Sequence, residues 1–229
     1  MTNIIAFAPQ YDTKGRHDAT GAFQPEAKAF LKFHGVTGGL FLIDNHRTDF
    51  EMREQVRGVL TPEVFDQGGK YIAIFCHGLS RQIQFGFDTR NVDQLAEAIG
   101  RASRGWPSPV VVLYCCSTAR GWRDKMGYLP EPVGGDGGFA DALRDALCRA
   151  GMTTCQVDAH TTAGHTTRNP YVRRFEGKGS PVGGVGGYFL VAPGSKLWKP
   201  WVKALRDTNL RYEFPFMQVS ELHERLMGA

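Results

Sequence analysis

Short apolar segments that alternate with amphipathic ones constrain the fold of this 229-residue chain more than any other feature. Continuous apolar runs are typical of strands buried on both faces, because a half-exposed strand would alternate apolar and polar residues. The expected strands cover residues 3–8, 39–44, 71–76, 109–115, 153–159 and 187–192. Segments with helical spacing of apolar residues lie between them, at residues 25–35, 47–60, 91–103 and 138–151. This order predicts one α/β domain with a mostly parallel sheet covered on both faces.

Composition narrows the classes of function. The formal net charge of +4 is too small to indicate a nucleic-acid partner. We expect no membrane partner, because no apolar run approaches the roughly 20 residues needed to cross a bilayer, and the N-terminal segment lacks the features of a signal peptide. The five cysteines are odd in number, and most lie in or beside apolar runs, which indicates a reducing, cytoplasmic setting.

Two expected strands end on residues that are suited to chemistry. The segment "YIAIFCHG" ends on His77 and Gly78, and "VVVLYCC" ends on Cys115 and Cys116. The carboxyl ends of parallel strands meet at one edge of a sheet, and right-handed crossovers would make these two strands neighbours. A thiol needs a base or a positive neighbour to react at neutral pH, and a glycine lets backbone approach a substrate closely. We therefore expect His77 and a cysteine to work together.

At these residues the sequence resembles the caspase-like (clan CD) cysteine peptidases, and "VVLYCCSTARG" is most similar to the cysteine segment of CHAT domains. The resemblance implies a caspase-like three-layer α/β/α sandwich around a mostly parallel six-stranded sheet. The chain would form a single domain, residues 1–229, with a core over about 3–192 and a helical C-terminal extension over about 193–229.

The resemblance also implies residue roles. Cys116 takes the place of the nucleophile and His77 that of the general base, while the N–H groups of Gly78 and Cys116 take the place of the oxyanion hole. Tyr114 occupies the position that often lines the first substrate pocket and is acidic in metacaspases, so a basic preference is not supported there. The step from His77 to Cys116 is 39 residues, whereas caspases have about 50.

Other residues have competing interpretations. Neighbouring strand residues face opposite sides, so only one of Cys115 and Cys116 can be reactive. The family register favours Cys116, and Cys115 remains the alternative. Cys76, Cys148 and Cys155 are expected in the core. Asp158 and His160, at the end of the expected fifth strand and in the loop that follows it, are candidates for a substrate pocket or belong to an ordinary surface loop. The basic run of Arg168, Arg173 and Arg174 is expected to be a solvated face.

The sequence thus predicts a cysteine endopeptidase that cleaves protein or peptide substrates through a thioester acyl-enzyme. It predicts no cofactor and no metal, since His160 and His165 are spaced by five residues in a loop and do not suit a closed ligand set. Two alternatives stay open. One is a catalytically inactive binding module of the same fold. The other is a doubly wound domain that binds a small molecule or nucleotide, with structural cysteines.

Overall fold

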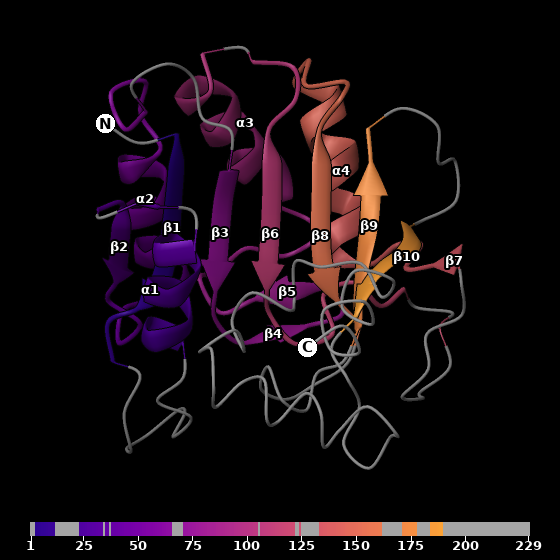
Figure 1. Ribbon diagram of the computed structural model, residues 1–229, viewed down its shortest axis with the longest axis horizontal. Helices are drawn as coiled ribbons and strands as arrows, with labels where there is room; N and C mark the ends of the chain where they lie inside the picture. The colour runs from indigo at the N-terminus through magenta and orange to yellow at the C-terminus, as the bar shows by residue number, and fades with distance from the viewer. Residues whose placement is uncertain are drawn as a thin grey trace, which may run out of the picture.

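A single sheet organises the computed structural model, which describes residues 3–11, 23–33, 35–36, 38–65, 71–104, 106–121, 124, 133–161, 171–177 and 184–189. All six expected strands are present and run in one direction (Figure 1). They are β1 (Ile4–Pro9), β2 (Leu40–Ile43), β3 (Tyr71–Phe75), β6 (Val110–Tyr114), β8 (Gln156–His160) and β10 (Gly184–Phe189). Residues 190–192 of the expected sixth strand lie outside the described ranges. The α/β class and the mostly parallel sheet are confirmed.

Two strands that the sequence pattern did not predict join the same sheet. β9 (Tyr171–Glu176) runs antiparallel to β8 and β10, and β7 (Val133–Gly134) runs antiparallel to β10. The order across the sheet is β2-β1-β3-β6-β8-β9-β10-β7. A separate small hairpin, β4 (Gly78–Leu79) and β5 (Gln82–Ile83), follows β3 directly. The six expected strands therefore form part of a wider mixed sheet.

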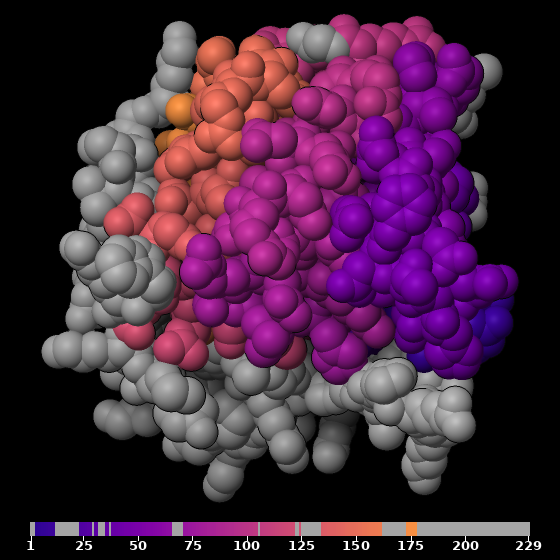
Figure 2. Space-filling view, turned by 180° about the vertical axis from the view of Figure 1, so that it is seen from behind, coloured from indigo at the N-terminus to yellow at the C-terminus, as the bar shows by residue number. Residues whose placement is uncertain are grey.

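Helices cover both faces of the sheet, an arrangement compatible with a three-layer sandwich. The expected helices appear as α1 (Phe23–Phe33), α2 (Asp49–Val59), α3 (Val92–Ala102) and α4 (Phe139–Arg149). In Figure 1, α1 lies in front of the sheet and α3 and α4 lie behind it. Figure 2 shows the back face, where α3 packs between α2 and α4. The predicted helices of the extension, near residues 197–207 and 219–228, lie outside the described residues.

Strand alternation divides the core into two layers. On β3, Ile72 and Ile74 face α2, α3 and α4, whereas Ala73 and Phe75 face α1. Both layers are apolar, which explains why these strands read as continuous apolar runs. Any residue that continues a strand can be assigned to a face by the same alternation.

Within the ranges that the structure describes, no helix has the length and apolar character needed to cross a membrane.

Candidate active site

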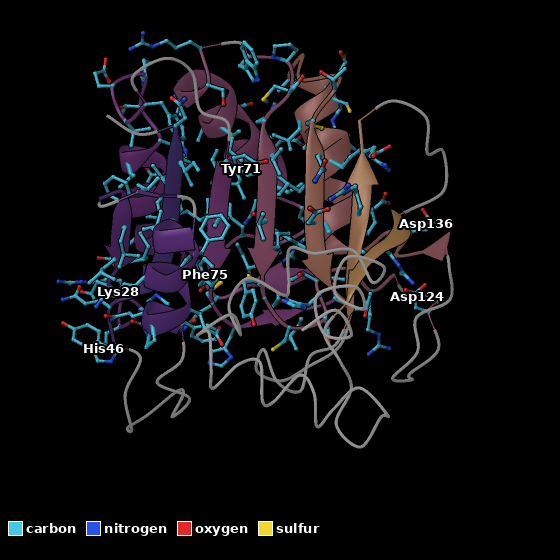
Figure 3. The ribbon with its side chains drawn as sticks, in the orientation of Figure 1. Lys28, His46, Tyr71, Phe75, Asp124 and Asp136 are labelled. Atoms are coloured by element: carbon cyan, nitrogen blue, oxygen red, sulfur yellow. The ribbon has the colours of Figure 1, made fainter. Side chains whose placement is uncertain are left out.

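The ends of β3 and β6 lie side by side in register. The last paired residues of the two strands are Phe75 and Tyr114, and Figure 3 labels Phe75 at the end of β3 from which His77 follows. Continuing this register by two residues aligns Cys76 with Cys115 and His77 with Cys116. Two contacts agree with this alignment: the sulfur atoms of Cys76 and Cys115 are 3.5 Å apart, and Gly78 adjoins the Cys116 carbonyl.

Cys115 lies on the sheet face that packs against α2, α3 and α4. Its side chain is 1% exposed, and its thiol donates to the Ile74 carbonyl over 3.3 Å. Burial, followed by the hydrogen bond with Cys76, raises the pKa of the Cys115 thiol well above its ordinary value. A buried neutral thiol of this kind is a poor nucleophile. The sequence left Cys115 and Cys116 as alternatives for the nucleophile, and the geometry favours Cys116.

His77 lies on the opposite face, with α1. Its ring meets the Phe23 ring edge-on, with centroids 5.0 Å apart. Extending the alternation of β6 by one residue beyond Cys115 assigns Cys116 to this same face. Both His77 and Cys116 are half-buried as residues, and Nε2 of His77 is itself enclosed by the protein. The arrangement places an imidazole and a thiol on one side of adjacent strand ends.

The β4–β5 hairpin fixes the backbone of His77. The N–H of Gln84 donates to the His77 carbonyl over 2.9 Å, and the His77 N–H donates to Oε1 of Gln84 over 3.2 Å. The hairpin is held in turn by α4, whose Phe139 N–H donates to the Ser80 carbonyl over 2.7 Å. Gln84 was not among the residues predicted from the sequence. The alternation of exposed Gln82 with buried Ile83 is the signal that could have revealed the hairpin.

The turn after Cys116 is held from two sides. The Ala119 N–H donates to the His160 carbonyl over 2.9 Å, and the Ala140 N–H of α4 donates to the Thr118 carbonyl over 3.0 Å. Ser117 adopts a left-handed backbone conformation, with φ of 59°. For a residue with a side chain this conformation costs on the order of 1–3 kcal/mol and is found most often at functional sites. The turn is therefore fixed at an energetic cost directly after the candidate nucleophile.

Gly78 is the point of closest approach between the two strand ends. A Cβ atom at this position would lie 2.7 Å from the Cys116 carbonyl oxygen, 2.8 Å from Cγ2 of Thr118 and 2.9 Å from Cβ of Cys115. Two of these three atoms are rigidly placed, as a backbone oxygen and a buried Cβ. Glycine is thus required here by space within the protein, whereas the close approach of a substrate that the sequence predicted at this residue stays a prediction.

The three predicted pocket residues lie together on the α1 face. Tyr114 is 6% exposed and its ring lies 5.1 Å from Phe75 and 4.5 Å, edge-on, from His160. His160 is the last residue of β8 and is 2% exposed. Asp158 and His160 are therefore strand residues, two positions apart on one face, and do not belong to an exposed loop.

Asp158 is already engaged within the protein. Its two oxygens accept hydrogen bonds from Arg174 over 2.9 and 3.2 Å, and Nε2 of Gln156 donates to it over 2.8 Å. Burial raises the pKa of Asp158, although the hydrogen bond and the charge of Arg174 act in the opposite direction. Arg174 balances the negative charge of Asp158. A substrate that reached this position would therefore meet an ion pair with no net charge.

The expectation of a solvated basic run is wrong for Arg173 and Arg174, which lie in β9. Arg173 is 2% exposed, and its guanidinium donates to the Ala119 carbonyl over 3.0 Å and to Asp124 over 2.6 Å. Burial alone would raise the pKa of Asp124, but hydrogen bonds from Arg173 and from the Gly135 N–H lower it below its usual value. Arg173 is buried and Arg174 half-buried, and each is paired with its own aspartate. Arg168 lies outside the described residues.

Among the described residues, no group of three or more His, Cys, Asp or Glu side chains is placed to hold a metal ion, and His165 lies outside them. The structure brings His77, Gly78 and Cys116 together and sets Tyr114, Asp158 and His160 beside them on one face. No protein-family model, no curated protein sequence and no solved structure matches this chain.

Proposed function

We propose that the protein is a cysteine peptidase of caspase-like fold in which His77 and Cys116 form the catalytic dyad. The observation that carries the proposal is the register of β3 and β6, which ends at Phe75 and Tyr114 and, continued by two residues, brings His77 level with Cys116. The burial of the cysteines supports it, because Cys116 is half-buried while Cys76 and Cys115 are fully buried. A histidine beside a reachable thiol is the arrangement that activates a cysteine nucleophile.

The reaction would proceed in two stages. Sγ of Cys116 attacks the carbonyl carbon of a peptide bond while its proton passes to His77. The tetrahedral intermediate collapses, the C–N bond breaks, and His77 returns the proton to the leaving amine. The thioester that remains is then attacked by water, which gives its proton to His77. The C–S bond breaks, His77 returns this proton to the Cys116 sulfur, and the carboxylic product leaves with the thiol restored.

Backbone N–H groups would supply the oxyanion hole. The N–H groups of Gly78 and Cys116 would donate to the oxyanion of the tetrahedral intermediate. Gly78 can serve there because its lack of a side chain allows the two strand ends to approach closely. The hydrogen bonds that hold the hairpin and the turn after Cys116 would keep these donors in place before substrate binds.

Thiol reactivity tests this proposal without a known substrate. The native protein is treated with sub-stoichiometric iodoacetamide near neutral pH, and the labelled cysteine is identified by peptide mapping. Cys116 should be labelled faster than an unstructured thiol peptide, and His77→Ala should slow it at least about tenfold. His46→Ala is the matched control, since His46 is exposed at the β2 end of the sheet edge (Figure 3).

Three labelling results would contradict the proposed dyad, each in a different way. If no cysteine reacts faster than the thiol peptide, the peptidase proposal fails, and a binding module or a small-molecule domain replaces it. If Cys116 reacts quickly but equally in the His77→Ala variant, His77 is not the base. Fast labelling at Cys115 would move the nucleophile by one residue. A peptide-library screen follows only after fast labelling that depends on His77.

A further inference from the structure

A second pair of thiols lies far from the candidate active site, where α4 ends and β8 begins. The sulfur atoms of Cys148, in the last turn of α4, and Cys155, just before β8, are 3.9 Å apart. A disulfide requires a sulfur–sulfur distance of about 2.05 Å. A modest side-chain rotation at the end of a helix can close the difference, because terminal helical turns are the least constrained part of a helix.

The two thiols differ in access. Cys148 is half-buried and donates to the Gly177 carbonyl over 3.3 Å, so a reagent can approach its sulfur. Cys155 is 1% exposed. Burial, and then the neighbouring Cys148, raises the pKa of the Cys155 thiol to about 12, with the charge of Arg144 acting against this. Cys148 is therefore the thiol that meets an external reagent first.

We propose that Cys148 and Cys155 form an intramolecular disulfide by exchange with a small-molecule disulfide such as oxidised glutathione. The Cys148 thiolate attacks one glutathione sulfur, the glutathione S–S bond breaks, and one reduced glutathione leaves. Cys155 then gives up its proton and attacks the Cys148 sulfur, and a second reduced glutathione leaves. The protein loses two hydrogen atoms and one oxidised glutathione becomes two reduced ones.

The bond would join the last turn of α4 to the start of β8, beside the end of β9. The backbone carbonyl of Cys155 accepts a hydrogen bond from the Gly177 N–H over 2.8 Å. The end of β9 therefore lies beside the Cys148–Cys155 pair. α4 in turn donates from Ala140 to the turn after Cys116. A disulfide at this point restricts the unfolded chain and should raise the melting temperature by about 5 °C.

The Cys76–Cys115 pair is an internal control. Its sulfur atoms are closer, at 3.5 Å, but its side chains are 0% and 1% exposed. If distance alone decided oxidation, this pair would react first. If access decides, Cys148–Cys155 forms in the native protein and Cys76–Cys115 stays reduced until the protein unfolds.

The test uses the full chain with Cys116→Ser, so that the candidate nucleophile does not react and the result is independent of the proposed peptidase activity. The native protein is incubated with oxidised glutathione, quenched with acid, and mapped without reduction. A Cys148–Cys155 cross-linked peptide, a loss of two hydrogen masses and a higher melting temperature are expected. Cys155→Ser should instead retain glutathione on Cys148, and Cys148→Ser should leave Cys155 unmodified.

The proposal is overturned if Cys148 stops at the mixed disulfide in the chain that retains Cys155, or if Cys148 does not react. It is also overturned if Cys76–Cys115 forms before Cys148–Cys155 in the native protein. A cross-link that appears only in urea would show that the native geometry does not permit it.

Discussion

At two strand ends and within one strand of the sheet, two consecutive polar or ionisable side chains face opposite sides. These pairs are Cys76 and His77 after β3, Cys115 and Cys116 after β6, and Arg173 and Arg174 in β9. The first member of each pair belongs to the face of α2, α3 and α4 and is at most 2% exposed. The second member belongs to the α1 face and is half-buried.

The comparison shows that two residues adjacent in the chain can differ completely in burial. Cys115 and Cys116 are the same residue type on the same strand end, yet only Cys115 is enclosed by the core, where its thiol stays protonated. Alternation makes this distinction, because the pleat turns successive side chains to opposite faces. The α1 face therefore collects the groups that could meet a substrate.

The largest expected effect separates the two neighbouring cysteines. Cys116→Ala should abolish the fast alkylation and reduce any peptidase turnover by at least about a thousandfold, since the nucleophile is lost. Cys115→Ala should retain the fast alkylation of Cys116 but lower the free energy of unfolding by about 1–2 kcal/mol, because it leaves a cavity in the core. Labelling rates and urea unfolding measure the two effects. Loss of reactivity in Cys115→Ala, with Cys116→Ala unchanged, would exchange their roles.

Gly78 tests whether the two strand ends must touch. Gly78→Ala puts a methyl group against the Cys116 carbonyl and should separate His77 from Cys116. We expect alkylation at Cys116 to slow about tenfold and the free energy of unfolding to fall by about 2 kcal/mol. Gly58→Ala is the control, because Gly58 lies in α2 with no atom near its Cβ position. That change should stabilise the helix by up to about 1 kcal/mol. A reactive, stable Gly78→Ala protein would contradict the close approach.

The two arginines of β9 should differ in their cost of removal. Arg173→Met leaves the charged Asp124 without its buried partner and should lower the free energy of unfolding by about 3 kcal/mol. Arg174→Met should cost less, about 1–2 kcal/mol, because Asp158 can take up a proton more readily. Urea unfolding at neutral pH measures both. A larger cost for Arg174→Met would show that the α1 face depends on its ion pair more strongly than the face of α2, α3 and α4 does.

Hydrophobic patterning was sufficient to predict the main elements. The expected strands and four expected helices fall on observed ones because each carries an apolar run or a helical stripe that must be buried. The parallel pairing of β3 and β6, from which His77 and Cys116 were expected at one sheet edge, was also predictable, since neighbouring parallel strands share their carboxyl ends. These features follow from local periodicity and from simple topology.

Features that depend on distant partners could not be predicted in the same way. β9 was missed because "YVRRFE" carries two arginines in succession, and only Asp124 and Asp158, distant in sequence, make their burial favourable. The register that separates Cys115 from Cys116 was equally hidden, because it depends on which face each strand turns to the core. The position of β9 and the faces of Cys115 and Cys116 depend on pairing across the sheet and not on composition.

The smallest expected effect is a difference in pH dependence between the two aspartates. The pKa of Asp124 is lowered in the folded protein, so its contribution is present above its unfolded pKa of about 4 and is lost as the pH falls through the folded value. The pKa of Asp158 is raised, so its contribution is greatest below about pH 4 and declines as the pH rises through the folded value.

Urea midpoints measured between about pH 3 and 7 should therefore lose pH dependence on opposite sides of about pH 4 in the two variants. Asp124→Asn should flatten the loss of stability on the acid side, because the variant has no carboxylate there to protonate. Asp158→Asn should leave the acid side unchanged and remove part of any decline above about pH 4. If both variants flattened the acid side equally, the two aspartates would be charged alike in the folded protein. The two faces of β9 would then differ in burial but not in electrostatics.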